Sequence, residues 1–211
     1  PSSKQSEKYL KQLGVKKINF IGNLKFSQSE NERLSKSDNE IKKFIQNKKT
    51  WCASSTHDTE ELLCGLVHKH LKKKYNNLLT FIIPRHIERT ESIIKELNDI
   101  NLITHTHEPK KKIPKNTDIY VVNSYGKTKS FYNIIKNIFL GGSLIKHGGQ
   151  NPLEATRYGC NILHGPNVNN FKEIYSLLGN LKISNKVSNY RQLSNELDKL
   201  FLKKQSSKKI Q

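Results

Sequence analysis

Methionine is absent from this 211-residue sequence, and cysteine and tryptophan are scarce, with three residues and one residue respectively. Cys52, Cys64 and Cys160 lie far apart in no CxxC or Cys/His pattern, which argues against a disulfide framework and a zinc site. This usage favours a cytoplasmic protein with reduced thiols. No apolar run approaches the roughly 18 residues of a membrane-spanning helix, so we expect any membrane contact of this chain to be peripheral.

Acidic residues are also few, since 18 stand against 37 lysines and arginines, for a formal net charge of +19. More than half of the excess lies outside the middle of the chain. Residues 1–49 hold 12 basic and 5 acidic side chains, whereas residues 50–202 hold 21 and 13. A basic surface of this kind attracts nucleic acid, anionic lipid or a phosphorylated substrate. The alternative interpretation is that the lysines only keep helix surfaces hydrated.

Apolar side chains are scarce in two segments, 27–49 and 203–211, which consist mostly of Ser, Asn, Gln, Glu and Lys. Such segments cannot offset their ordering entropy by burial. We therefore expect a linker over 27–49, a globular domain over 50–202 and a flexible basic tail over 203–211. Residues 1–26 carry a helix-like stretch, Ser6–Leu13, and a short strand, Ile18–Ile21. They resemble the end of a preceding domain, so we expect the chain to be a fragment.

From Thr50 onward, short apolar runs alternate with amphipathic stretches, which is the pattern of repeated βα units. The sequence therefore predicts an α/β fold, a Rossmann-like parallel sheet flanked by helices. Strands are expected at 50–54, 78–83, 118–122, 137–140 and 161–163. Helices are expected at 59–75, 87–98, 127–136, 152–158, 169–178 and 189–202.

Polar and glycine-rich turns follow the predicted strands. In an open parallel sheet, ligands bind beyond the carboxyl ends of the strands, where such turns meet. We therefore expect a phosphate- or nucleotide-binding cleft at that edge, lined by the turns at 54–57, 84–86, 125–127, 141–143, 148–152 and 165–166.

The segment from Gly141 to Glu154 carries the strongest prediction. Its glycine pairs would let backbone amides approach a ligand closely, because no Cβ intervenes. Asn151 suits a helix N-cap and Pro152 suits the first helical position, so the helix start would direct free N–H groups toward an anion. Glu154 has two interpretations: it completes a capping box with Asn151, or it binds the ribose hydroxyls of a nucleotide.

Arg85, His57 and His86 each follow a predicted strand. Arginine presents a fixed fork of donors to phosphate or carboxylate oxygens, and the two histidines could donate to the same anion. The alternatives are a solvated surface arginine and histidines with a structural role. Ser55 and Thr56 either contact the ligand or cap the helix that follows.

Together these segments resemble the 3-deoxy-D-manno-octulosonic acid (Kdo) transferases of Gram-negative bacteria. The order and spacing of the segments carry the resemblance, which covers most of residues 9–178. The matching stretches are Trp51–His57, Ile83–His86 with Glu88–Arg89, Gly141–Leu144, Gly148–Ala155, Gly165–Pro166 and Asn170–Lys172. In addition, Gly22–Phe26 is similar to the segment that closes the family's amino-terminal domain.

The resemblance implies the C-terminal domain of a two-Rossmann (GT-B) glycosyltransferase. Residues 50–202 would be its nucleotide-sugar-binding domain and residues 1–26 the tail of the acceptor domain. The implied reaction moves Kdo from CMP-Kdo to a lipid A precursor in lipopolysaccharide biosynthesis. It takes place at an anionic membrane surface, on the cytoplasmic face of the bacterial inner membrane. No metal and no other cofactor is implied, and the general base and the membrane anchor are expected outside this chain.

The resemblance also implies site residues. CMP would be held by the positions that match the family's binding residues: Pro84, Arg85, Tyr125, Gly126, Lys127, Asn151, Pro152, Leu153 and Glu154. The same edge offers further donor contacts at Ser55, Thr56, His57, His86, Gly141, Gly142 and Ser143. One departure is Lys127, where the family usually has glutamate, with aspartate in place of Asn123. A lysine can meet a phosphate but cannot accept hydrogen bonds from ribose or base, which permits a shifted donor preference.

Two other functions fit parts of the sequence. A basic nucleic-acid-binding protein would show a helix-turn-helix, zinc or RNP-type signature, or aromatic residues among its basic runs. No such signature is present, and the lysine runs 72–74 and 110–112 lack aromatic residues apart from Tyr75. A different nucleotide-sugar enzyme of the same fold, such as an epimerase or a UDP-sugar transferase, stays open because a fold does not fix a function.

Overall fold

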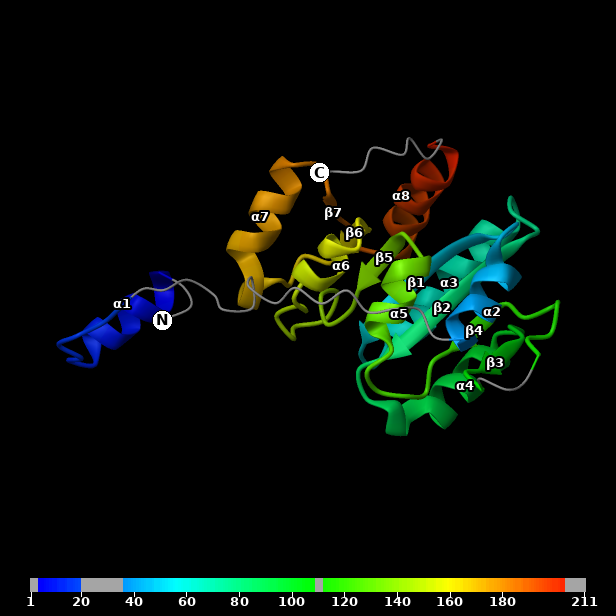
Figure 1. Cartoon of the computed structure of the whole chain (residues 1–211), viewed down its shortest axis with the longest axis horizontal. Helices are drawn as coiled ribbons and strands as arrows, with labels where there is room; N and C mark the ends of the chain where they lie inside the picture. The colour runs from blue at the N-terminus through cyan, green and yellow to red at the C-terminus, as the bar shows by residue number, and fades with distance from the viewer. Residues whose placement is uncertain (1–3, 20–35, 109–111, 204–211) are drawn as a thin grey trace. The chain divides into compact units, whose positions relative to one another are not determined.

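The computed structural model describes residues 4–19, 36–108 and 112–203 (Figure 1). The chain divides into two units, Pro1–Arg33 and Leu34–Gln211, which are described separately. In the first unit, helix α1 (Lys4–Gln12) confirms the helix expected there, and an ion pair of 2.7 Å between Glu7 and Lys11 links its successive turns. No strand forms at residues 18 and 19, and the remainder of the expected strand lies outside the described residues.

The second unit is built on a seven-stranded sheet in the order β3-β4-β2-β1-β5-β6-β7. Every neighbouring pair of strands is parallel, which confirms the predicted sheet. The strands are β1 (Lys49–Thr56), β2 (Leu78–Pro84), β3 (Thr104–Thr106), β4 (Ile119–Val121), β5 (Asn137–Leu140), β6 (Asn161–His164) and β7 (Ser184–Lys186).

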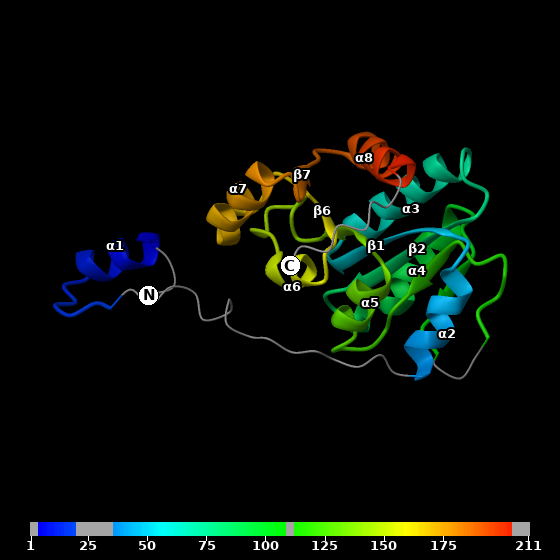
Figure 2. The same cartoon turned by 45° about the horizontal axis from the view of Figure 1, so that its top comes forward.

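Helices cover both faces of the sheet (Figures 1 and 2). They are α2 (Lys36–Ile45), α3 (Glu60–Lys72), α4 (Thr90–Asp99), α5 (Thr128–Ile134), α6 (Leu153–Arg157), α7 (Lys172–Asn180) and α8 (Tyr190–Leu202), with 3₁₀ turns at η2 (Ile87–Arg89) and η3 (Asn169–Phe171). The α3, α4 and α8 side chains share one buried cluster, and those of α2, α5, α6 and α7 share the other.

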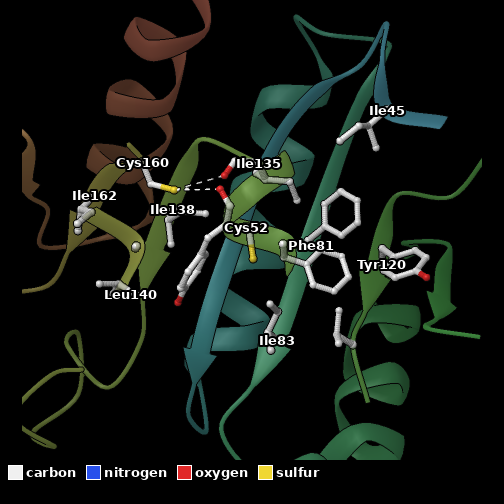
Figure 3. Close-up of a cluster of buried hydrophobic side chains, with 14 of the residues drawn as sticks. Ile45, Cys52, Phe81, Ile83, Tyr120, Ile135, Ile138, Leu140, Cys160 and Ile162 are labelled. Atoms are coloured by element: carbon white, nitrogen blue, oxygen red, sulfur yellow. Dashed lines mark hydrogen bonds between the residues drawn. The ribbon is translucent and has the colours of Figure 1, made fainter. Parts of the chain in front are cut away.

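The pleat of the central strand β1 explains why there are two cores. Successive side chains of a strand point to opposite faces, so Trp51 and Ala53 pack on the α3 side and Cys52 packs on the α5 side. Figure 3 shows this second cluster, in which Cys52 lies near Phe81 of β2 and Ile138 of β5. The three cysteines are buried and free, so they serve as small core side chains.

Three elements differ from the sequence prediction. The expected linker over 27–49 is wrong for residues 36–49, because these residues form α2 and the start of β1, with Ile41 and Ile45 buried in the core. The edge strands β3 and β7 were not predicted, since Thr-His-Thr and Ser-Asn-Lys carry no apolar alternation. Residues 27–35 of the linker and 204–211 of the tail lie outside the described residues.

Within the described ranges, no helix combines the length and the apolar composition that crossing a membrane requires.

Candidate functional site

The strand order places a topological switch point between β1 and β5. From β1 the chain builds β2, β3 and β4 on one side, and it then returns to the other side of β1 with β5, β6 and β7. The connections that leave β1 and β5 therefore diverge, and the carboxyl ends of strands at such a switch point are where an open parallel sheet binds its ligand. His57 follows β1 there, and Gly141 and Gly142 follow β5. The expected site residues meet at this edge.

A buried carboxylate fastens the two central turns together. Glu60 is fully buried, and its side chain accepts hydrogen bonds from the backbone N–H groups of His57 (3.0 Å), Gly142 (2.7 Å), Ser143 (3.2 Å) and Leu144 (3.0 Å). These four donors satisfy the hydrogen-bonding capacity of the buried carboxylate. The amides of Gly142 and Ser143 are consequently occupied, which corrects the expectation that they bind the donor directly.

Gly141 and Ser143 also have structural roles. A Cβ on Gly141 would lie 2.5 Å from the Ser55 carbonyl oxygen, so only glycine lets the end of β5 pack this closely on β1. The buried Ser143 hydroxyl donates to the Leu140 carbonyl and accepts from the Gly165 amide at 2.8 Å. The Gly141 amide donates to the Ser54 carbonyl at 2.9 Å, so this amide and the Ser143 hydroxyl are both engaged within the protein.

The end of β2 carries an available cation. Pro84 is buried and closes the strand, and the Arg85 amide donates to the Thr56 carbonyl at 2.9 Å, which joins this turn to the end of β1. The Arg85 side chain is exposed, and in the described part of the chain no carboxylate pairs with its guanidinium. Arg89 differs, because it pairs with Asp58 at 2.6 Å.

The turn after β4 reaches toward both neighbouring segments. Tyr125 is 62% exposed, and its hydroxyl lies 3.4 Å from the Glu88 carboxylate. Gly126 has a φ of +73°, in the left-handed region that favours glycine, and it turns the chain so that α5 begins after Lys127. At the start of α5, Thr128 donates to the Glu154 carboxylate at 3.2 Å. This bond connects the turn to the start of α6.

The start of α6 shows one half of the capping box that the Asn-x-x-Glu spacing suggested: Asn151 acts as a cap, but in the described contacts Glu154 does not bond back to it. The Asn151 side chain accepts from the Leu153 amide at 3.1 Å, so Asn151 caps the helix, and Pro152 precedes Leu153 in helical geometry. The Glu154 carboxylate bonds to Thr128, and the described contacts contain no bond from it to the Asn151 amide. Helix α6 has five residues where 152–158 was expected, so its dipole is small and an anion here depends on side chains.

Three histidines gather beside these turns. The ring of His57 lies 5.7 Å from that of His86 and 4.1 Å from that of His147, centroid to centroid. The amide nitrogen of Gln150 lies 3.3 Å from His57 Nε2. Burial, and then the positive charges of its neighbours, lower the pKa of His57 to about 4. The expected residues His57 and His86 therefore do meet at the edge.

Sequence reasoning missed Glu60, His147 and Gln150. The bonds of Glu60 to the β5 turn join residues 82–84 positions apart, which no local pattern reveals. His147 and Gln150 flank the Gly148-Gly149 pair inside a segment already recognised as polar. Their position in that segment was the available signal, but only the folded loop shows that both reach His57.

No family model matches the chain. A 3-deoxy-D-manno-octulosonic acid transferase of Haemophilus influenzae is 32% identical over 164 residues, which are 77% of this chain and 38% of that protein. The protein of the same name from Rickettsia conorii is 33% identical over 177 residues, 81% of this chain and 37% of that protein. The chain thus spans well under half the length of these curated relatives.

The fold has a counterpart among solved structures, the C-terminal CMP-Kdo binding domain of WaaA from Acinetobacter baumannii. The two superpose with a TM-score of 0.71 at 23% identity, over 78% of this chain and 89% of that one. This confirms the expected fold, the C-terminal domain of a GT-B glycosyltransferase. By sequence, the chain is a homologue of the 3-deoxy-D-manno-octulosonic acid transferases.

Proposed function

We propose that this chain is the donor-binding part of a glycosyltransferase that moves Kdo from CMP-Kdo to a lipid A precursor in lipopolysaccharide biosynthesis. Two findings support the proposal together. The chain is about one third identical to Kdo transferases over most of its length. The residues that the resemblance assigns to CMP lie at the carboxyl edge of the sheet, where an α/β fold holds its ligand.

The observation that carries the nucleotide assignment is the joining of three segments at this edge. The Tyr125 hydroxyl lies 3.4 Å from the carboxylate of Glu88, in the segment that follows Arg85, and Thr128, which follows Lys127, bonds to Glu154. In the proposed complex, Arg85 and Lys127 contact the phosphate of CMP, and Glu154 accepts from the ribose hydroxyls. Tyr125 is exposed beside them and offers a flat ring to the base.

The proposed roles of these residues are binding and orientation. As the bond from the Kdo anomeric carbon to the phosphate oxygen breaks, negative charge develops on the departing CMP, and the two cations stabilise it. The acceptor hydroxyl must lose a proton to a general base, which we assign to a part of the relatives that this chain does not match. This chain by itself is therefore proposed to bind donor without turnover, and to do so without a metal or other cofactor.

The basic charge of residues 1–49 supports a proposed location at a membrane surface. Basic residues outnumber acidic ones by 12 to 5 in residues 1–49, and Lys42 and Lys43 of α2 are exposed. Lysines near an anionic bilayer contribute about 1 kcal/mol each to its attraction. We propose that this charge keeps the chain at the cytoplasmic face of the bacterial inner membrane, near the lipid acceptor.

Thermal stability in the presence of nucleotides tests the proposal. A ligand present at about 100 times its Kd stabilises the folded state by about 2.7 kcal/mol. For a chain of this size that raises the Tm by about 5–10 °C. We expect CMP to raise the Tm more than UMP or AMP, and Arg85→Ala to remove the effect while the matched surface variant Arg191→Ala keeps it. Equal effects of the three nucleotides would contradict a cytidylate site.

A further inference from the structure

Three imidazoles from three different loops converge at the switch point. His57 follows β1, His86 follows β2, and His147 lies between β5 and α6. The ring of His57 lies between the other two, with centroid distances of 5.7 Å and 4.1 Å. His86 and His147 are exposed, whereas His57 is 8% exposed and its backbone is held by Glu60. The cluster is therefore held in place through the buried His57, and its other two rings are accessible to solvent.

The charges that face His57 are positive. Arg85, His86, Arg89 and His147 all disfavour its protonated form, after burial, which is the larger cause of its lowered pKa. With a pKa of about 4, His57 is neutral at pH 7 in the empty protein. Protonating His57 beside these groups has an electrostatic cost that a bound anion would offset.

Among the described residues, the surrounding carboxylates reach one of the three rings. Glu88 lies 3.3 Å from His86 Nδ1, whereas Asp58 and Glu61 pair with Arg89 at 2.6 Å and 3.0 Å. The remaining carboxylate, on α3, is bound by four backbone amides. In the described part of the chain, no acidic side chain bonds to the imidazole ring of His57 or of His147.

Gln150 can serve both protonation states of His57. Its amide nitrogen lies 3.3 Å from Nε2, so it donates to the neutral imidazole. If His57 gains a proton, rotation of the amide presents its oxygen as an acceptor instead. Gln150 directly precedes Asn151, which we assign to the nucleotide, so the cluster adjoins the proposed CMP site.

We propose that His57, His86 and His147 form an oxyanion subsite of the donor pocket, and that filling it is coupled to proton uptake by the cluster. This inference rests on the proposed function. The oxyanion is either the phosphate or the sugar carboxylate of the donor, since both present the same chemistry to imidazolium. Because a proton enters with the anion, donor affinity rises as the pH falls from about 7 to about 5, toward the pKa of about 4 that His57 has without the anion, by up to about tenfold for each pH unit.

Histidine titrations followed by NMR on the whole chain test the coupling without any substitution. The probes are cytidine, CMP and free Kdo, which carry neither anion, the phosphate and the carboxylate respectively. We expect the pKa of His57 to rise from about 4 by at least two units with CMP if phosphate fills the subsite, or with Kdo if the carboxylate does, and not with cytidine. Unchanged histidine titrations with both anions would overturn the inference.

Calorimetry of CMP binding at pH 7 and pH 5 provides a second test if phosphate is the occupant. His147→Gln should lose most of the protein's pH-dependent gain in affinity, whereas the control His70→Gln, which removes an exposed histidine of α3, should keep it. The CMP phosphate titrates with a pKa of about 6, but it does so equally in every variant, so the comparison isolates the histidines. If CMP binds but the histidines respond to neither anion, the oxyanion subsite is contradicted and the proposed function is not. A chain that fails to prefer CMP would instead contradict the proposed function.

Discussion

Glu60 and Glu154 are two carboxylates at the same edge of the sheet with different surroundings. Glu60 is fully buried and its oxygens accept from four backbone amides. Glu154 is partly exposed, and Thr128 contacts one of its oxygens at 3.2 Å. A carboxylate surrounded by amides holds the backbone in place, whereas one with free acceptor capacity can bind a ligand. We expect substitution of the two residues to have separable effects.

Replacing Glu154 with glutamine should weaken CMP binding without unfolding the chain. A hydrogen bond to a charged group contributes about 1.5–3 kcal/mol, which corresponds to a loss of roughly 10- to 100-fold in affinity. Isothermal titration calorimetry measures the affinity, and the Tm should stay within about 2 °C of the unaltered chain. Unchanged affinity in Glu154→Gln would remove Glu154 from the site.

The change Glu60→Gln should instead destabilise the fold. The carboxamide NH₂ would face backbone N–H donors, so at least one buried amide would lose its acceptor, at a cost of about 1–3 kcal/mol. Urea denaturation reports this loss as a lower midpoint. Glu173→Gln on the exposed surface of α7 is the matched control and should not change the midpoint. Equal urea midpoints for the two variants would show that Glu60 does not hold the β1 and β5 turns together.

Residue-level reasoning found the polar positions better than it found their roles. Arg85, His57 and Asn151 do lie at the edge that the strand pattern predicted. The roles expected for Gly142 and Ser143 changed because a buried carboxylate from another helix occupies their amides. Such a contact depends on how two elements pack, which the spacing of residues along the chain does not encode.

At the scale of elements, the end of β5 approaches the end of β1 closely, beside the candidate site. A Cβ on Gly141 would lie 2.5 Å from the Ser55 carbonyl oxygen and 2.6 Å from the Thr56 Cα. Both atoms belong to the backbone, so neither can move without shifting a central strand. The glycine is therefore a packing requirement of two elements.

Gly141→Ala should lower the free energy of unfolding by about 1–3 kcal/mol or more, because overpacking at this contact forces the strands apart. Gly179→Ala is the contrasting control: it lies in α7 with no atom within 4 Å of an added Cβ. There, alanine should stabilise the chain by about 0.4–1 kcal/mol. Equilibrium denaturation of the two variants measures both effects, and a neutral Gly141→Ala would contradict the packing argument.

The elements themselves were predictable where apolar periodicity was strong. The five central strands and the helices from α3 to α8 match the predicted ranges closely. Helix α2 was missed because Ile41, Phe44 and Ile45 stand in a segment otherwise composed of polar residues. Its burial comes from the sheet face that it covers, so tertiary packing decided the helix and local composition did not.

At the scale of the whole molecule, most of the excess positive charge lies in segments of the sequence other than those that form the candidate site. The site depends on a few side chains at one edge of the sheet, and most of the excess charge lies in residues 1–49 and in the last nine residues. The sequence predicted a parallel sheet whose strand ends meet. It did not predict the strand order, because order depends on which side of β1 each unit packs.

This separation predicts two different responses to salt. Association of the chain with vesicles containing an anionic phospholipid should fall at least tenfold between 50 and 200 mM salt, since surface charges are screened over about 8–10 Å at physiological ionic strength. CMP affinity should fall only a few-fold over the same range. Vesicle sedimentation and calorimetry measure the two quantities. Equal binding to neutral vesicles would rule out charge as the cause of association.

The most direct measurement is an NMR map of backbone amide shifts on adding CMP to the chain. Our account predicts the largest shifts at Arg85, at Tyr125–Lys127 and at Asn151–Glu154, with smaller ones at His57. Residues at the amino ends of the strands, such as Lys49 of β1 and Leu78 of β2, should not respond. Shifts concentrated at the amino ends of the strands, or no shifts at saturating CMP, would contradict the proposed CMP site.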